Sequence, residues 1–306
     1  MHRRIVVIGS SNVDFIMKME RLPRRGETVT DATFAQTFGG KGANLAVGAA
    51  RAGGDVWFVN CVGNDAFGPL LQNNLYEAGV HTDYIFIEEG VATGAALVMV
   101  DRQGENYLSV APGANYRLTP DRVAAVRPLL EEAALVALQY EVLPETLYAA
   151  IDLAHALGRP VLFNLAPARP FDCTYLPRVT YLVVNEVEAQ ALCGFAVDSP
   201  ERAAEAAGLL LERGVRAVII TLGAAGAYLA APDLRMHLPS FPVEAVDTTA
   251  AGDIFCGALA TALVEGRSLL DAARFASAAA ALSVTRMGAQ PSAPRRAEID
   301  YLLERA

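Results

Sequence analysis

Short apolar runs alternate with longer segments of helical spacing along this chain. The first apolar run is Ile5–Gly9, and later ones are Val56–Val62, Leu135–Gln139, Val161–Asn164, Tyr181–Val184, Ala217–Thr221 and Gly226–Ala231. The helix-length segments are Phe67–Ala78, Pro120–Leu130, Glu145–Leu157, Glu186–Leu192, Glu201–Arg213, Cys256–Val264, Leu269–Val284 and Arg295–Arg305. Apolar strands that alternate with helices are typical of a parallel sheet covered on both faces. The pattern therefore predicts one α/β domain over residues 1–306, since no linker divides it.

Two segments depart from this rhythm. Val29–Phe38 and Gly94–Val110 alternate polar and apolar residues without helical spacing. Such alternation predicts strands of a half-exposed sheet, separate from the buried one. This small sheet would be either a lid over a ligand crevice or an elaboration of the main sheet's edge.

Composition limits the classes of partner. Of 306 residues, 53% are hydrophobic and 19% charged, and the net charge of −9 argues against a cationic surface for nucleic acid. The four cysteines and four histidines are dispersed. We therefore expect neither a disulfide framework nor a zinc site, and a reducing cytoplasm fits the chain. The apolar run after the amino-terminal Met1–Arg4 is too short for a signal sequence or a membrane span.

Polar side chains follow several of the predicted strands. They are Asn12, Asp14, Glu141, Asn164, Asn185, Glu188 and Thr221. Each alone is explained as a turn former or a helix cap. In open parallel sheets, however, ligands bind outside the carboxyl ends of the strands. The recurrence of these residues at strand ends favours a site for a sugar, a metal ion or a phosphate.

A glycine-rich turn, Phe38–Asn44, precedes a small-residue helix that extends to Arg51. It lacks the Ser or Thr that follows Gly-Lys in the Walker motif, and it also lacks the dinucleotide-binding pattern. Paired glycines let a backbone approach a ligand closely, and Lys41 and Asn44 would offer it polar groups. The alternative interpretation is an ordinary strand-to-helix turn with a solvated lysine.

A second glycine-containing stretch, Ala245–Phe255, places three small residues and then Asp253 where a helix begins. The first N–H groups of a helix lack intrahelical partners and lie at the positive end of its dipole, so they form an anion site. An aspartate beside a bound phosphate would handle a proton or a metal ion. The alternative is that Thr248 or Thr249 caps a buried helix and Asp253 only favours its dipole.

Taken together, these motifs resemble those of the ribokinase-like carbohydrate kinases, the PfkB family, over essentially the whole chain. The matching stretches are Gly9–Asp14, Pro23–Thr28, Gly39–Asn44, Asn185–Glu188, Thr221–Gly223, Ala245–Asp253 and Thr285–Ser292. The resemblance implies a ribokinase-like, doubly wound and mostly parallel sheet with helices on both faces, plus a β-sheet lid from about 13–19, 29–38 and 93–110. It also implies transfer of the γ-phosphoryl group of ATP to a sugar hydroxyl, with Mg²⁺ and with K⁺ as activator.

The resemblance also assigns roles to residues. Asp253 matches the catalytic base, and Ala250, Ala251 and Gly252 match an anion hole of backbone N–H groups. Such a site suits phosphoryl transfer, which depends on positioning and charge stabilisation. The sugar side is similar to that of members that phosphorylate D-ribose on its 5-hydroxyl, with contacts at Asn12, Asp14, Gly39, Gly40, Lys41, Asn44 and Glu141, and at Ala96 and Val98 of the lid. The nucleotide side corresponds to Asn185, Thr221, Gly223, Gly226, Gly252 and Ser277.

Two sets of residues match metal sites of the family. Asn185 and Glu188 reproduce its Asn-x-x-Glu motif, which is associated with Mg²⁺ and phosphate. The residues that match the monovalent-cation site, several through backbone carbonyls, are Asp247, Thr249, Ser283, Arg286, Gly288 and Ser292. The resemblance further implies a homodimer that forms through the lid sheets.

The chain departs from the ribose-phosphorylating pattern at two positions. Cys256 replaces an asparagine three residues after the base, and Ser277 replaces an adenine-pocket histidine. Rival acceptors within the family are a ketose, a deoxy sugar, a sugar acid or a nucleoside. A sugar acid is disfavoured because Asp14 and Glu141 lie in the matched pocket, although Lys41 could pair with its carboxylate. A non-catalytic sugar or nucleotide sensor of the same fold is the remaining alternative.

Overall fold

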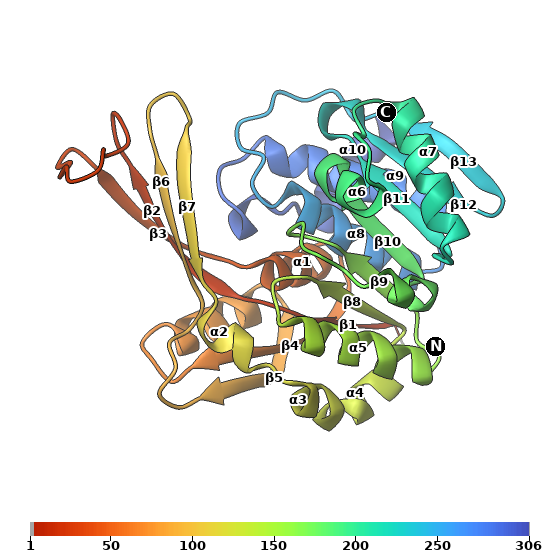
Figure 1. Ribbon diagram of the computed structural model, residues 1–306, viewed down its shortest axis with the longest axis horizontal. Coiled ribbons are helices and arrows are strands. Elements are labelled where there is room, and N and C mark those ends of the chain that lie inside the picture. The colour runs from red at the N-terminus through yellow and green to blue at the C-terminus, as the bar shows by residue number, and fades with distance from the viewer. Residues whose placement is uncertain (1–2, 306) are drawn as a thin grey trace.

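Nine strands form the main sheet of the computed structural model, which describes residues 3–305; Met1 and His2 of the amino-terminal stretch lie outside that range (Figure 1). Their spatial order is β13-β12-β11-β10-β9-β8-β1-β4-β5. The strands are β1 (Arg4–Ile8), β4 (Asp55–Gly63), β5 (Val80–Glu88), β8 (Leu135–Gln139), β9 (Val161–Asn164), β10 (Tyr181–Asn185), β11 (Ala217–Thr221), β12 (Ala227–Ala231) and β13 (Leu234–Leu238). All neighbouring pairs from β11 to β5 are parallel, and β12 and β13 pair antiparallel. The predicted mostly parallel sheet is therefore confirmed.

Helices cover both faces of this sheet, because successive residues of a strand point to opposite sides. Ile5 and Val7 pack into one hydrophobic core and Val6 and Ile8 into the other. The first core contains α1 (Lys41–Arg51), α2 (Gly68–Glu77), α8 (Ala251–Val264), α9 (Leu269–Val284) and α10 (Arg296–Glu304). The second contains α3 (Pro120–Ala125), α4 (Arg127–Glu131), α5 (Pro144–Ala156), α6 (Glu186–Cys193) and α7 (Pro200–Glu212). Short 3₁₀ turns are η1 (Gly113–Arg117), η2 (Cys173–Arg178), η3 (Gly223–Ala225) and η4 (Gln290–Ser292).

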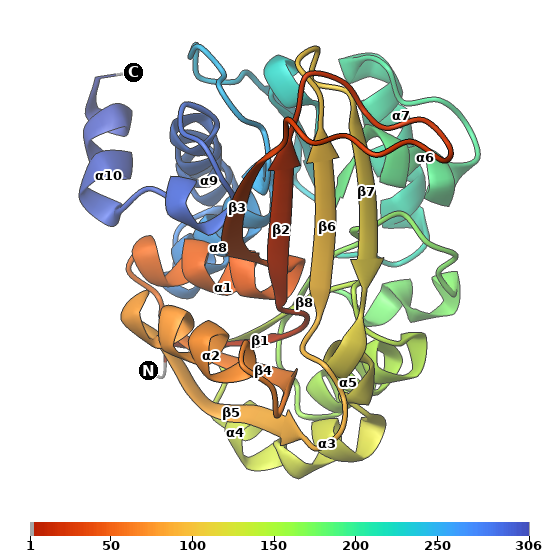
Figure 2. The ribbon, with the colours of Figure 1, turned by 90° about the vertical axis from the view of Figure 1, so that its left-hand side faces the viewer.

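A second sheet of four strands projects from the body beside the carboxyl ends of the main strands (Figures 1 and 2). Its order is β3-β2-β6-β7, and its strands are β2 (Asn12–Lys18), β3 (Thr33–Gly39), β6 (Ala95–Val100) and β7 (Asn106–Ala111). β2 follows β1 after three residues, so the lid begins where the first core strand ends. The separate half-exposed sheet predicted from alternation is confirmed.

The structure corrects several predicted elements. The segment Pro120–Leu130 is two short helices, because Pro128 has no N–H to continue a helix through it. Gly94–Val110 is two strands joined by a turn in which the Gly104 N–H donates to the Asp101 carbonyl at 3.0 Å. Strand β3 begins at residue 33 rather than 29. Helix α8 begins at Ala251, where the small residues before Asp253 predicted a helix start, five residues before the apolar run Cys256–Val264.

Two strands of the main sheet were not predicted at all. β5 and β13 are its edge strands; β13 carries polar residues at alternate positions, Arg235 and His237, whereas β5 has three consecutive polar residues, His81–Asp83. The search for continuous apolar runs passed over both strands: β13 has no such run, and in β5 the short run Tyr84–Ile87 follows three polar residues. No helix of residues 3–305 combines the length and the apolar character that a membrane crossing requires.

Candidate active site

Two cavities lie at the carboxyl ends of the main strands, below the root of the lid. The first, of about 220 Å³, is lined by Lys41, Asn185, Glu188, Asp253 and residues around them. The second, of about 340 Å³, is lined by Ser10, Asn12, Asn115, Glu141 and residues at the end of the lid and just after β8. The Lys41 backbone N–H donates to Glu141 Oε2 at 2.9 Å, so the two cavities share a wall. Polar residues predicted from separate strand ends are thus brought together.

The start of α8 forms one wall of the first cavity. Ala250 precedes the helix with φ 60° and is the one non-glycine residue at positive φ among residues 3–305. A left-handed alanine is strained, and such strain persists where the surrounding structure holds a functional backbone. No side chain caps this helix, and the Thr249 N–H instead donates to Asp247 Oδ1 at 2.9 Å. The alternative of a threonine-capped helix is therefore wrong. The Ala251 N–H donates to the Thr248 carbonyl at 3.3 Å, whereas the Gly252 N–H at the cavity wall has no hydrogen-bond partner among the described residues.

Asp253, in the first turn of α8, is only 5% exposed. Its Oδ2 accepts a hydrogen bond of 2.9 Å from Asn44 Nδ2, from the helix α1. Burial raises the pKa of Asp253 to about 6, while the charge of Lys41 and the bond from Asn44 oppose that rise. The negative charge of Asp253 in turn raises the pKa of Lys41. At neutral pH the site thus holds a buried carboxylate that can accept a proton, beside a lysine ammonium.

The glycine-rich turn positions α1 by close backbone contact. Gly40 has φ 88°, and a Cβ there would lie 2.6 Å from the Ser11 Cα. A Cβ at Gly42 would lie 2.6 Å from the Ser10 backbone nitrogen. The chain after β3 can therefore lie directly against the chain after β1, and α1 starts there and directs Lys41 to the first cavity.

The second cavity contains a network of hydroxyl, amide and carboxyl groups. Ser10 Oγ donates to Glu141 Oε2 at 2.7 Å, and Asn115 Nδ2 donates to Asn12 Oδ1 at 2.9 Å. Burial and the nearby charge of Glu141 raise the pKa of Asp14 to about 7. Oxygen and amide groups of this kind hold polyol hydroxyls.

Ser10 and Asn115 were not predicted as site residues. Ser10 lies inside the recognised Gly9–Asp14 stretch, so a signal for it existed. Asn115 lies on η1, about a hundred residues from Asn12, and no local motif marks it. Only the tertiary fold brings its side chain to this cavity.

The Asn-x-x-Glu motif forms a capping box at the start of α6. Asn185 Oδ1 accepts from the Glu188 N–H, and Glu188 Oε2 accepts from the Asn185 N–H, both at 2.9 Å. Glu188 is 5% exposed and faces the first cavity, and burial raises its pKa to about 7. One carboxylate oxygen is thus used in the cap. The other is a hard oxygen ligand of the kind that Mg²⁺ and its bound water prefer.

The remaining nucleotide-side residues are more dispersed. Thr221 ends β11 and lines the first cavity, as do Ala251 and Gly252. Gly223 and Gly226 lie in the β11–β12 hairpin, where a Cβ at Gly226 would lie 2.1 Å from the Leu238 carbonyl oxygen. Ser277 lies half-buried on α9. Within the described range, none of these last three residues lines either cavity.

The segments predicted to hold a monovalent cation lie together. The Gly288 N–H donates to Asp247 Oδ2 at 2.8 Å, and the Asp247 N–H donates to the Val284 carbonyl at 3.1 Å. Ser283 and Ser292 are buried, and each hydroxyl donates to a nearby carbonyl. The Arg286 side chain pairs with Glu298, so Arg286 could contribute only its carbonyl. A set of carbonyl oxygens with Asp247 suits K⁺.

The lid residues named from sequence lie on β6. Ala96 is the register partner of Asp14 on β2, and Val98 is the partner of Ile16. A Cβ at Gly39 would lie 2.1 Å from Asp14 Oδ2, so glycine leaves room for that carboxyl group. Asp14, Gly39 and Ala96 thus meet at the root of the lid.

Comparison with known proteins gives the same family throughout. The profile described as "pfkB family carbohydrate kinase" matches residues 2–296. A ribokinase of Haemophilus influenzae is 36% identical over all of both chains, and a deoxyribokinase of Salmonella typhi is 37% identical over 95% of each. A solved ribokinase of Arabidopsis thaliana, complexed with ribose and ATP, superposes with a TM-score of 0.92 at 33% identity over 99% of each chain. This chain therefore belongs to the pfkB family of carbohydrate kinases.

Proposed function

We propose that this chain transfers the γ-phosphoryl group of ATP to the 5-hydroxyl of D-ribose. The observation that carries the proposal is Asp253, a buried carboxylate in the first turn of the uncapped helix α8, inside a cavity that also holds Lys41 and Glu188. Phosphoryl transfer requires a base, an anion-binding site and positive charge near the phosphates. Here the base would be Asp253, the anion site the start of α8, and the positive charge that of Lys41 and of a cation bound by Glu188. The similarity to a ribokinase complexed with ribose and ATP supports the choice of substrates.

In the proposed reaction, Asp253 accepts the proton of the sugar hydroxyl while the hydroxyl oxygen bonds to the γ-phosphorus. The bond from that phosphorus to the β–γ bridging oxygen breaks, and ADP leaves. The N–H groups of Ala251 and Gly252, with Ala250 at the turn, stabilise the transferring phosphoryl group. Asn12, Asp14, Lys41, Asn44 and Glu141 orient the sugar, and Gly39 and Gly40 let the turn lie against the Asp14 carboxyl group and the Ser11 backbone.

Two metal ions belong to the proposal. Glu188 and Asn185 would hold Mg²⁺ or its bound water, and that ion would neutralise phosphate charge. The carbonyls near Ser283, Arg286 and Gly288, with Asp247, Thr249 and Ser292, would hold K⁺ and so fix the loop before α8. We also infer a homodimer joined through the lid sheets, one folded unit per chain, and a cytoplasmic location. Four free thiols support a reducing compartment.

A specific observation favours one second acceptor, 2-deoxyribose, because a deoxyribokinase is as similar to the chain as a ribokinase is. Steady-state rates of ADP release decide between ribose and 2-deoxyribose as the acceptor. They are measured with ribose, 2-deoxyribose, fructose and nucleosides, each with and without K⁺. We expect the highest kcat/KM with ribose and an increase in rate on adding K⁺. A higher kcat/KM with another acceptor would make that acceptor the proposed substrate in place of ribose. Absence of turnover with every acceptor would favour the alternative of a non-catalytic sensor.

A further inference from the structure

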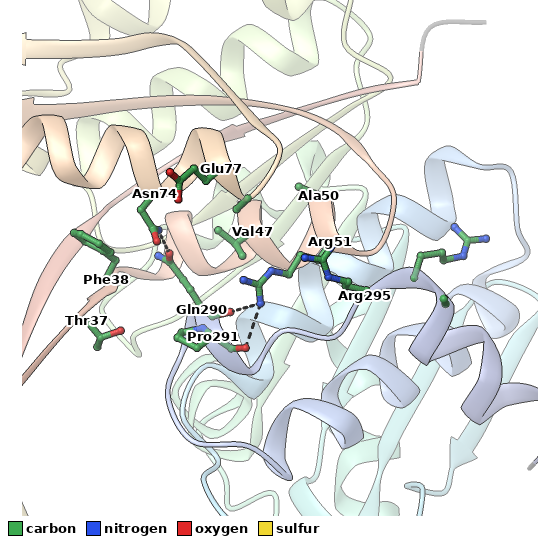
Figure 3. Close-up of a pocket in the computed structure, with 13 residues that line it drawn as sticks. Thr37, Phe38, Val47, Ala50, Arg51, Asn74, Glu77, Gln290, Pro291 and Arg295 are labelled. Carbon is green, nitrogen blue, oxygen red and sulfur yellow. Dashed lines mark hydrogen bonds between the residues drawn. The ribbon is translucent and has the colours of Figure 1, made fainter.

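A third cavity, of about 540 Å³, lies outside the candidate active site (Figure 3). The second half of α1 forms one wall through Val47 and Arg51, and α2 forms another through Asn74 and Glu77. The end of β3 and the segment 290–297 close the rest. Its volume is in the range of small-molecule sites. Helix α1 joins it to the active site, since Lys41 and Asn44 lie at the start of that helix and Arg51 is its last residue.

The cavity has an excess of positive charge. Arg51 and Arg295 both line it, and within residues 3–305 neither has a carboxylate at ion-pair distance. Burial, together with the charges of Arg295 and Arg286, lowers the pKa of Arg51. The charge of Glu298 opposes this lowering, but Glu298 is ion-paired with Arg286 rather than with either of these arginines. Two neighbouring guanidinium groups without an ion pair form a site for an oxyanion, and their planar forks match the geometry of phosphate.

Gln290 gives a second, independent indication of a ligand. It lines the cavity, is 4% exposed, and its Oε1 accepts from Asn74 Nδ2 at 2.6 Å. Its Nε2 is buried and has no hydrogen-bond partner among the described residues. A buried donor without a partner is costly, and a turn of this amide toward the cavity, where a bound acceptor could pair with it, would remove that cost. Figure 3 shows Arg51 and Arg295 on one side of the cavity and Asn74 and Glu77 on the other.

We propose that this cavity binds a sugar monophosphate. Its phosphate would lie against Arg51 and Arg295, and its hydroxyls would lie toward Gln290, Asn74 and Glu77. The arginine side supplies charge, whereas the amide and carboxylate side supplies donors and acceptors for a polyol. The carboxylate of Glu77 disfavours a ligand that carries anionic groups at both ends.

The site also contacts the segment proposed to hold K⁺. Arg51 Nη1 donates to the carbonyls of Gln290 and Pro291 at 2.8 and 3.2 Å (Figure 3). It also donates to the Ala293 carbonyl at 2.9 Å, while Nε and Nη2 remain as donors for a phosphate. A bound phosphate would therefore fix Arg51 without releasing the segment. Because the segment stays held in place, the ligand lowers the K⁺ concentration needed for half-maximal activation. The coupling between the two sites is reciprocal. This coupling rests on the proposed function, whereas the binding does not.

Titration calorimetry on the full chain tests the binding, with ribose 5-phosphate, glycerol 3-phosphate, AMP and inorganic phosphate as probes and saturating ADP in the active site. Arg295→Gln removes one cationic group, and Arg295 is exposed and has no ion pair, so folding is retained. Arg274→Gln, an exposed arginine on α9, is the matched control. We expect about tenfold weaker sugar-phosphate binding in Arg295→Gln and no change in Arg274→Gln.

Three results would overturn the proposal: equal affinity in Arg295→Gln and wild type, absence of binding by every probe, or affinity for inorganic phosphate or AMP equal to that for the sugar phosphates. The coupling is tested separately, from the K⁺ dependence of ADP release with and without glycerol 3-phosphate. An unchanged K⁺ requirement removes the coupling. Failure of the kinase assay itself would leave the calorimetric result standing, so the two failures are distinguishable.

Discussion

Asp253 keeps a raised pKa although Lys41 and Asn44 both favour its charged form, because burial outweighs them. A base with a pKa of about 6 is ionised at neutral pH and is still basic enough to take a proton in a preformed contact. As the proposed base, Asp253 would have no substitute, since the described cavity lining offers only Glu188 as another carboxylate, and its Oε2 is engaged in the α6 cap.

Replacing Asp253 with Asn should therefore lower kcat by several orders of magnitude and leave ribose affinity within a few-fold. The amide keeps the size of the carboxyl group but cannot accept the proton. Rapid-quench turnover and ribose titration by calorimetry measure the two effects. Asp233→Asn, an exposed aspartate in the β12–β13 turn, is the control. Turnover near that of wild type in Asp253→Asn would remove the residue from its role as base.

Asp14 gives a prediction for stability rather than rate. Its pKa is about 7 in the folded protein, whereas the ordinary value, which applies to the unfolded chain, is 3.8. At a pH between these two values the folded state therefore binds more protons than the unfolded state. The free energy of unfolding contributed by this group consequently falls as pH rises from about 4 to about 7, and the penalty is complete above pH 7.

The Asp14→Asn variant lacks this penalty. We expect its Tm to exceed that of wild type by about 2–4 °C at pH 8, corresponding to about 1 kcal/mol after solvent screening. The gain should shrink at pH 4.5, while ribose affinity falls at both values. Thermal unfolding across pH 4.5–8 checks this. A Tm difference that does not vary with pH would show that the carboxylate charge is not its cause.

At the scale of elements, the site depends on the contact between α1, which carries Lys41 and Asn44, and α8, which carries Asp253. The two helices meet through glycine. A Cβ at Gly257 would lie 2.4 Å from the Leu45 carbonyl oxygen and 2.5 Å from the Ala49 backbone nitrogen. Backbone atoms cannot rotate away, so any larger residue would separate the helices.

Gly257→Ala should destabilise the protein by about 1–3 kcal/mol and lower kcat more than it raises the KM for ATP. Gly208→Ala is the matched control, because Gly208 also lies inside a helix, α7, and has open space around its Cα. That variant should gain about 0.5–1 kcal/mol and keep its activity. Denaturant unfolding and ADP-release kinetics on both proteins test the pair, and equal stability changes would contradict the close-contact argument.

The distinction between local signals and tertiary packing explains which strands and site residues the sequence could predict. Glycine-bounded stretches are local signals, so Lys41, Asn44 and Asp253 were found, and buried strands such as β8 were found from continuous apolar runs. The edge strand β13 produces no such run, and in β5 the short run Tyr84–Ile87 follows three polar residues. The αL conformation of Ala250 and the place of Asn115 arise from tertiary packing, which leaves no mark on the neighbouring sequence.

At the scale of the whole molecule, the lid exposes apolar side chains on both faces. Leu108 is 63% exposed, and register places it with Val98 and Ile16 on the face that carries Asp14. Tyr107, 55% exposed, lies on the opposite face beside Met99. A small sheet with apolar side chains in water favours a partner, and a second lid over the Asp14 face would also shield the sugar from water.

Leu108→Glu should therefore turn a homodimer into a monomer at micromolar concentration and raise the KM for ribose, because a charge would be buried where the two lids meet. Tyr107→Glu, with a similar exposure on the other face, should stay dimeric with an unchanged KM. Sedimentation velocity gives the oligomeric state of both variants and of wild type, and ADP release gives the KM. A wild-type monomer would refute lid pairing, whereas dissociation by Tyr107→Glu alone would move the interface to the opposite face of the lid. Either result would leave the proposed role of Asp253 in place, since Asn44, which donates to its carboxylate, lies on α1 of the same chain.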